Sequence, residues 1–160
     1  MREASSKDKA DIVPTPSFCF IRFRLGIGEQ ENKHFMKAFS KDEIVAVYKA
    51  AYLMVVADGK VLSQEIEMVN DAMHKFGVMD ICKLEEIKTF AEKITIEECY
   101  GQLAFLDNEQ KRFVSAMLGA ISSSDGDIDD SELELWRKIC SNSDLPKMNN
   151  RQAIAIFQSY

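Results

Sequence analysis

A short acidic turn occurs twice in this sequence of 160 residues. It consists of an Asp-Gly pair with a glutamate seven residues after the aspartate. Its copies are Asp58-Gly59 with Glu65 and Asp125-Gly126 with Glu132. The copies coincide when the chain is laid on itself with an offset of 67 residues. Because the turn recurs at a fixed offset, the segments that flank the first copy are expected to have the same structure as those that flank the second. We therefore expect one folding unit to be used twice.

Helix signals surround both turns. Ser40 and Glu43 form a capping box, in which a hydroxyl and a carboxylate satisfy free backbone amides, and Asp107 with Gln110 repeats the signal at the same offset. Gly59 is a residue type that can take the left-handed conformation beyond a helix end without a steric penalty. Each repeat therefore predicts a helical hairpin, and the two hairpins are expected to pack together with pseudo-symmetry, because neither can bury its apolar face alone.

The rest of the chain beyond Ser40 is helical in pattern. Hydrophobic content of 46%, 29% charged residues, 7 Gly and 3 Pro are typical of a globular helical protein. The predicted fold is all-α, with about seven helices, two pseudo-repeated hairpins and a short strand-like N-terminal extension. The predicted helices cover about 40–57, 64–76, 82–94, 96–106, 108–124, 130–141 and 150–159.

The first 35 residues differ from the remainder. Pro14 and Pro16 exclude a helix from the polar start, and residues 18–25 alternate with the period of a strand. Such a strand packs on its own domain, pairs with another chain or joins a hairpin at Gly26 to Gly28. We therefore predict a tail and strand-like extension over 1–35 and a helical domain over 36–160.

Charge and cysteine usage exclude several classes of function. The formal net charge of -6 argues against a nucleic-acid partner, since phosphate binding needs clustered lysine and arginine. The four cysteines lie far apart, without the spacing of a zinc or redox site. No apolar stretch has the length of a signal peptide or a membrane span, so a cytoplasmic protein without direct membrane insertion is expected.

The turns resemble the second half of a calcium-binding EF-hand loop, but the first half is missing. Met54 and Ile121 occupy the first loop position, where calcium needs an oxygen ligand. Asp58 and Asp125 each follow a helix and face the negative end of its dipole, which calls for compensation by the amides of the next helix or by a cation. The helical register turns Glu65 toward the inside of the protein, and Glu132 likewise.

Two interpretations of the turns follow. In one, the acidic residues are caps that close tight hairpins, and no metal binds. In the other, the two turns meet and bind a divalent cation, calcium, magnesium or manganese, through oxygen ligands. The predicted ligands are Asp58, Glu65, Asp125, Asp127, Asp129 and Glu132.

The segment AYLMVVADGKVLSQEIEMV, residues 51–69, resembles the signature of the tellurite-resistance TerB-like family, and ISSSDGDIDDSELELWRKI is similar to its second acidic repeat. The family also occurs in DnaJ-like membrane co-chaperones, but this chain has no His-Pro-Asp motif. The resemblance implies an all-helical fold of about seven helices, a divalent-metal-binding acidic face at Asp58, Glu65, Asp125 and Glu132, and a scaffolding role in stress-response complexes.

The sequence therefore favours a non-enzymatic helical module that binds a cation and an unidentified protein partner. A metal-free interaction module is the alternative, with Phe18, Phe20 and Phe23 mediating association, and self-association of the chain is left open. The spacing of Glu31 with His34, and of Asp71 with His74, only weakly resembles a di-iron site, because Asp71 and His74 point away from the apolar face. An enzyme ranks third, since no motif activates a nucleophile.

Overall fold

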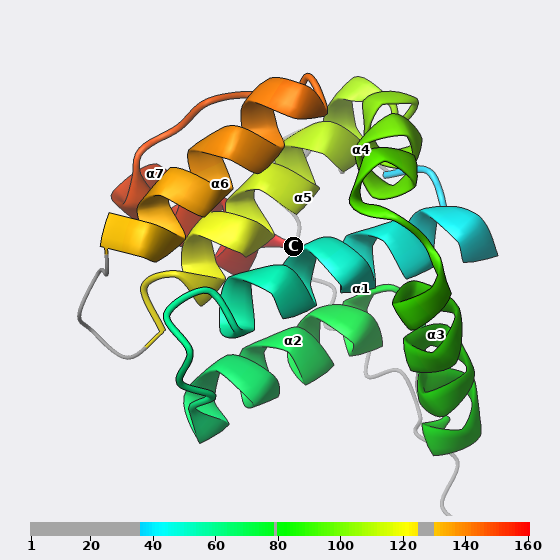
Figure 1. The fold of residues 1–160 in the computed structure, drawn as a ribbon. Coiled ribbons are helices and arrows are strands. Elements are labelled where there is room, and N and C mark those ends of the chain that lie inside the picture. The colour runs from blue at the N-terminus through cyan, green and yellow to red at the C-terminus, as the bar shows by residue number, and fades with distance from the viewer. Residues whose placement is uncertain (1–35, 79, 125–129) are drawn as a thin grey trace, which may run out of the picture. The chain divides into compact units, whose positions relative to one another are not determined.

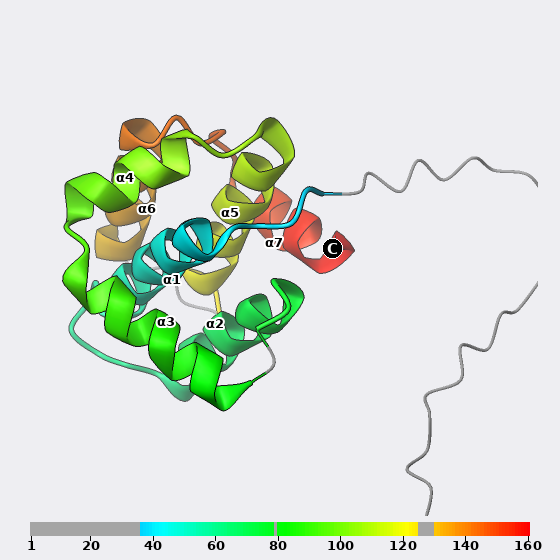
Figure 2. The same ribbon diagram turned by 90° about the vertical axis from the view of Figure 1, so that its right-hand side faces the viewer.

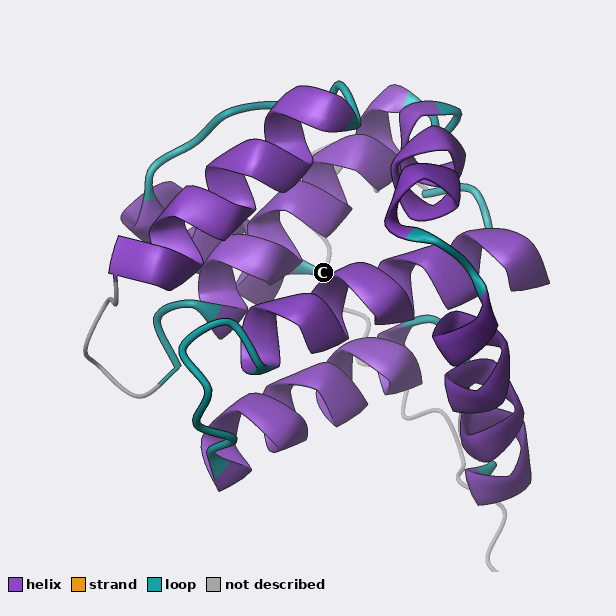
Figure 3. Ribbon diagram, viewed as in Figure 1, coloured by secondary structure: helices purple, strands orange, loops and turns teal. Residues whose placement is uncertain are grey.

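The computed structural model describes residues 36–78, 80–124 and 130–160, and all regular structure in these ranges is helical (Figures 1 and 3). The all-α prediction is confirmed, whereas the strand-like segment 18–25 lies outside the described residues. No described helix is long and apolar enough to cross a bilayer. The helices are α1 (Lys41–Val55), α2 (Ser63–Lys75), α3 (Ile81–Lys93), α4 (Ile96–Ala104), α5 (Asn108–Ile121), α6 (Asp130–Asn142) and α7 (Asn150–Ser159).

Each predicted capping box lies at the start of a helix, as expected. Ser40 Oγ accepts a hydrogen bond from the N–H of Glu43, and the Glu43 carboxylate accepts one from the N–H of Ser40. Thr95 with Glu98 begins α4 in the same way, and Asp107 with Gln110 begins α5. A further box, Asn149 with Gln152, begins α7 and was not predicted. Local hydrogen bonding thus determines where four of the described helices begin.

The internal repeat is visible in the helices themselves. At the offset of 67, α2 coincides with α6 from end to end, and α1 coincides with α5 at its first residue. α3 then packs against α1, and α7 packs against α5, so each half contains three helices and α4 joins the halves. α1 lies in the middle and also contacts α4, α5 and α6 (Figures 1 and 2).

The repeat extends to the ends of α2 and α6, of which only the end of α2 carries the glycine signal in the sequence. Gly77 follows α2 with φ 80°, and the N–H of Val78 returns to the carbonyl of Met73 at 3.0 Å. At the equivalent place Asp144 has φ 51°, and the N–H of Leu145 returns to the carbonyl of Cys140 at 3.0 Å. Both helices therefore end in a left-handed residue, although only one of them has the glycine that this conformation favours.

A close contact holds the second half together. A Cβ atom added at Gly119 of α5 would lie 2.5 Å from Cζ2 of Trp136 on α6 and 2.6 Å from Cβ of Ala153 on α7. Trp136 is 2% exposed and Ala153 is fully buried, so the indole ring belongs to the hydrophobic core. The missing side chain of Gly119 thus lets three helices meet.

Gly77→Ala is expected to lower the free energy of unfolding by about 1–2 kcal/mol, because an L-residue with a Cβ is strained in the left-handed region. Asp144→Gly, at the matched position, is expected to leave stability unchanged or raised, because the exposed ion pair of Asp144 with Lys111 contributes at most about 1 kcal/mol. Urea unfolding measures both changes. A loss in Asp144→Gly as large as that in Gly77→Ala would contradict the equivalence of the two positions.

Gly119→Ala is expected to lower the free energy of unfolding by about 1–3 kcal/mol, because the new methyl group overlaps Trp136 and Ala153. Gly101→Ala is the matched control, since Gly101 lies in α4 with no atom within 4 Å of an added Cβ. In this control the free energy of unfolding is expected to rise by about 0.5–1 kcal/mol, because alanine has a better helix propensity than glycine. Thermal and urea unfolding compare the two variants, and a stabilising Gly119→Ala would show that the contact is looser than described.

Candidate functional site

The first acidic turn is closed by hydrogen bonds to its own backbone. Asp58 Oδ1 accepts a hydrogen bond from the N–H of Lys60 at 2.7 Å, and Glu65 Oε2 accepts one from the N–H of Leu62 at 2.8 Å. Gly59 lies in the turn four residues beyond the end of α1 and takes a left-handed conformation with φ 78°. Asp58 therefore shapes the turn, and Glu65 satisfies an amide at the start of α2 where Leu62 offers no side-chain acceptor.

Both glutamates of the repeat face the interior, as the helical register predicted. Glu65 is 3% exposed and Glu132 is 6% exposed. Met54 and Ile121, which exclude an EF-hand, are buried in α1 and α5. The side chains before each turn thus belong to the hydrophobic core. They supply no oxygen ligand at the first position of a calcium loop.

The second acidic turn is described only in part. The predicted ligands Asp125, Asp127 and Asp129 lie outside the described residues, so the meeting of the two turns stays a prediction. Within the described ranges, no three histidine, cysteine or acidic side chains converge on one point. Asp71 and His74 are exposed on α2, as predicted.

Two of the cysteines are buried and protonated. Burial raises the pKa of the Cys99 thiol to about 11, and the Cys99 Sγ donates a hydrogen bond to the carbonyl of Ala46. Burial also raises the pKa of Cys140, despite its contact with Ser115. Both thiols are therefore packing groups at neutral pH, because the thiolate is the reactive form.

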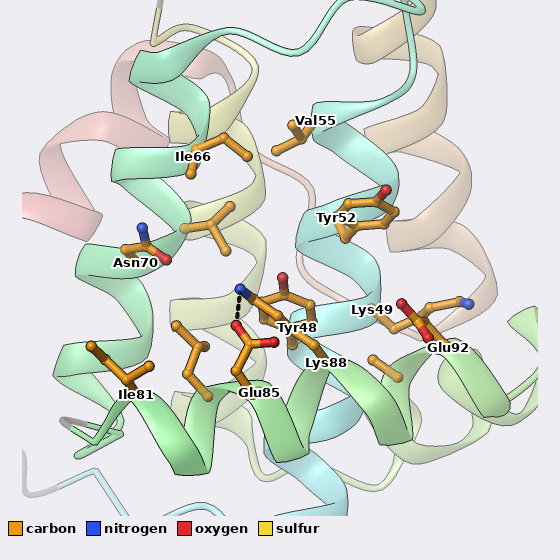
Figure 4. A pocket seen from close by; sticks show the side chains of 13 residues that line it. Tyr48, Lys49, Tyr52, Val55, Ile66, Asn70, Ile81, Glu85, Lys88 and Glu92 are labelled. Atoms are coloured by element: carbon orange, nitrogen blue, oxygen red, sulfur yellow. Dashed lines mark hydrogen bonds and ion pairs between the residues drawn. The ribbon is translucent and has the colours of Figure 1, made fainter.

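An open groove lies between α1, α2 and α3 (Figure 4), and the sequence analysis did not predict it. Its volume is about 460 Å³, within the usual range of small-ligand and anchor pockets. The side chains that line it are mostly apolar. They are Tyr48, Tyr52, Val55, Ile66, Val69, Ile81, Leu84 and Ala91, with Lys49, Asn70, Glu85, Lys88 and Glu92 as the polar members.

Large apolar side chains at the edge of this groove are exposed to solvent. Ile81 is 77% exposed, Tyr52 is 47% exposed and Ile66 is 38% exposed. Ile66 lies on the same helix face as Val69 and Met73, which are buried. Helical periodicity does not distinguish a face that is covered from one that borders an open groove, because both carry the same apolar residues.

The polar groups of the groove keep defined charge states. Lys88 Nζ donates a hydrogen bond to Glu85 Oε1 at 2.7 Å, and this bond raises the pKa of Lys88. Burial raises the pKa of the Tyr48 hydroxyl, with the ammonium of Lys88 opposing the effect. At neutral pH the groove therefore contains a protonated lysine beside a neutral phenol. Tyr48 and Tyr52 lie nearly parallel, with ring centroids 6.5 Å apart.

The fold and its turns define an all-helical protein made from a repeated three-helix unit. No family model and no curated protein matches the chain. Among solved structures, it is similar to PG1108 of Porphyromonas gingivalis, described as a protein of unknown function, with 34% identity and a TM-score of 0.69. The match covers 78% of this chain and 100% of PG1108. The chain therefore belongs to the same family as PG1108.

Glu65→Ala is expected to lower the free energy of unfolding by about 1–3 kcal/mol, because it removes the acceptor for the N–H of Leu62. Glu65→Gln is expected to lower the free energy of unfolding much less, since the side-chain carbonyl of glutamine can still accept that hydrogen bond. Urea unfolding in buffer treated with a chelator measures both variants. Equal losses would show that the negative charge, rather than the acceptor, stabilises this turn.

Proposed function

We propose that the chain is a non-enzymatic helical module that binds a protein partner through the groove between α1, α2 and α3. The observation that carries the proposal is the exposure of Tyr52, Ile66 and Ile81 around an apolar space of about 460 Å³. Contiguous exposed apolar surface with a polar rim is typical of interaction sites. Grooves between helices commonly bind an amphipathic helix through a few apolar anchor residues.

The groove suits binding better than catalysis. Its titratable groups are a lysine, a tyrosine and carboxylates, and the pKa of both Lys88 and Tyr48 is raised, away from neutral pH. A general acid or base works best with a pKa near the operating pH, so these shifts oppose such a role. The resemblance to the tellurite-resistance TerB-like family supports a scaffolding role in a stress response.

Selection of peptides from a random helical library tests this proposal without knowledge of the natural partner. Enriched peptides are expected to lose at least tenfold in affinity for Ile66→Lys, because the substitution places a charge in the apolar groove. Phe105→Lys is the matched control, since Phe105 is 88% exposed and does not line the groove. Peptides that bind Ile66→Lys as well as they bind the unaltered protein would refute the proposed site.

A second candidate function is divalent-cation binding by the paired acidic turns. The burial of Glu65 in the repeated turn favours it, because a carboxylate away from water needs compensating partners. The hydrogen bond from Leu62 uses one oxygen of Glu65. In this proposal calcium, magnesium or manganese contacts the acidic groups and fixes the position of one hairpin relative to the other.

Calorimetric titration with each cation tests this second candidate. Binding is expected to release or absorb heat and to raise the melting temperature, because a ligand that binds only the folded state stabilises it. Asp58→Asn combined with Asp125→Asn is expected to remove both effects. If the unaltered protein shows neither heat nor a shift in melting temperature, the acidic residues act only as caps.

A further inference from the structure

The groove between α1, α2 and α3 has a counterpart in the other half of the repeat. A second groove of about 400 Å³ lies beside α6 and the segment that leads to α7. Four of its lining residues match those of the first groove at the offset of 67. The pairs are Leu133 with Ile66, Trp136 with Val69, Arg137 with Asn70, and Met148 with Ile81.

The two grooves differ at one large side chain. In the second half, the indole ring of Trp136 lies against Gly119 and covers α5, and no residue of α5 lines the groove. In the first half, the equivalent position holds the smaller Val69, and four residues of α1 line the groove. The residue equivalent to Gly119 is Tyr52, which is 47% exposed. The first half thus lacks the ring that covers the central helix in the second.

We propose that a partner protein supplies this ring, as a tryptophan side chain that enters the groove and covers Tyr48 and Tyr52. The inference rests on the proposed function and adds the identity of the anchor residue. The chain itself shows which group fills the equivalent place, because Trp136 fills it in the second half with 2% of its surface exposed. Tryptophan is also among the commonest anchors of protein interfaces.

Electrostatics favour an aromatic anchor over an aliphatic one. Figure 4 shows Lys88 and Asn70 directed into the space between the three helices, with Tyr48 at its floor. The Lys88 ammonium is attracted to the negative face of an aromatic ring, as Lys41 and Lys75 already illustrate over Phe90 and Phe157. This charge complementarity is absent for leucine or isoleucine, which have no ring quadrupole.

Hydrogen bonding distinguishes tryptophan from phenylalanine. The Nε1 of Trp136 has no hydrogen-bond partner among the described residues, so the ring in the second half is held by packing alone. In the first groove, Asn70 and Tyr48 line the space, and an amide oxygen or a hydroxyl can accept a hydrogen bond from an indole N–H. A net gain of about 0.5–1.5 kcal/mol is typical for such a bond.

Titration with N-acetyl-tryptophanamide, followed by NMR, tests the inference directly. Resonances of Tyr52, Ile66 and Leu84 are expected to shift, and the affinity is expected to exceed that of N-acetyl-leucinamide at least fivefold. Ile66→Lys is expected to abolish the shifts, and Val69→Trp is expected to weaken them by filling the groove from within. Phe105→Lys is the control and is expected to bind as the unaltered protein does.

The outcomes separate this inference from the proposed function. Equal or tighter binding of the leucine derivative, or shifts that lie away from the groove, would overturn the tryptophan anchor. Groove-dependent peptides selected from the library without a shared tryptophan would overturn it too, while leaving the proposed function intact. If no groove-dependent peptide is selected, the proposed function fails first and the inference fails with it.

Discussion

The contact of Gly119 with Trp136 and Ala153 is the constraint on which the second half of this protein depends. It lets α5, α6 and α7 meet around one indole ring, since no Cβ atom fits between them. The first half uses the same helices in the same order, but Tyr52 stands where Gly119 stands and Val69 stands where Trp136 stands. The two halves thus differ in whether an indole ring covers the central helix or leaves it to line a groove.

Much of the fold could be predicted from the sequence, because its helix boundaries are set locally. Ser40 with Glu43 and Asp107 with Gln110 fix the starts of α1 and α5 through hydrogen bonds between near neighbours. The end of α6 was harder to explain, because Asp144 takes the left-handed conformation without being a glycine. Aspartate is one of the few residues other than glycine that take this conformation, so Asp144 gives a weaker sequence signal than Gly77.

The candidate site was less predictable than the fold. The inward direction of Glu65 and Glu132 followed from helical register, yet the groove did not, because Tyr48 and Tyr52 lie at the same helical spacing as core residues. Only the arrangement of α3 against α1 shows that these rings face an open space. Three of the predicted metal ligands lie at 125–129, outside the described residues, so the cation site remains a proposal.

One helical unit is used twice, with its central helix covered by Trp136 in the second half and exposed to a groove in the first. NMR relaxation enhancement by an inert paramagnetic cosolute measures this difference at matched positions. Strong enhancement is expected at the ring of Tyr52 and at the side chain of Ile66, with little at Gly119 or Trp136. Equal protection of Tyr52 and Trp136 would contradict it, because the first half would then be as closed as the second.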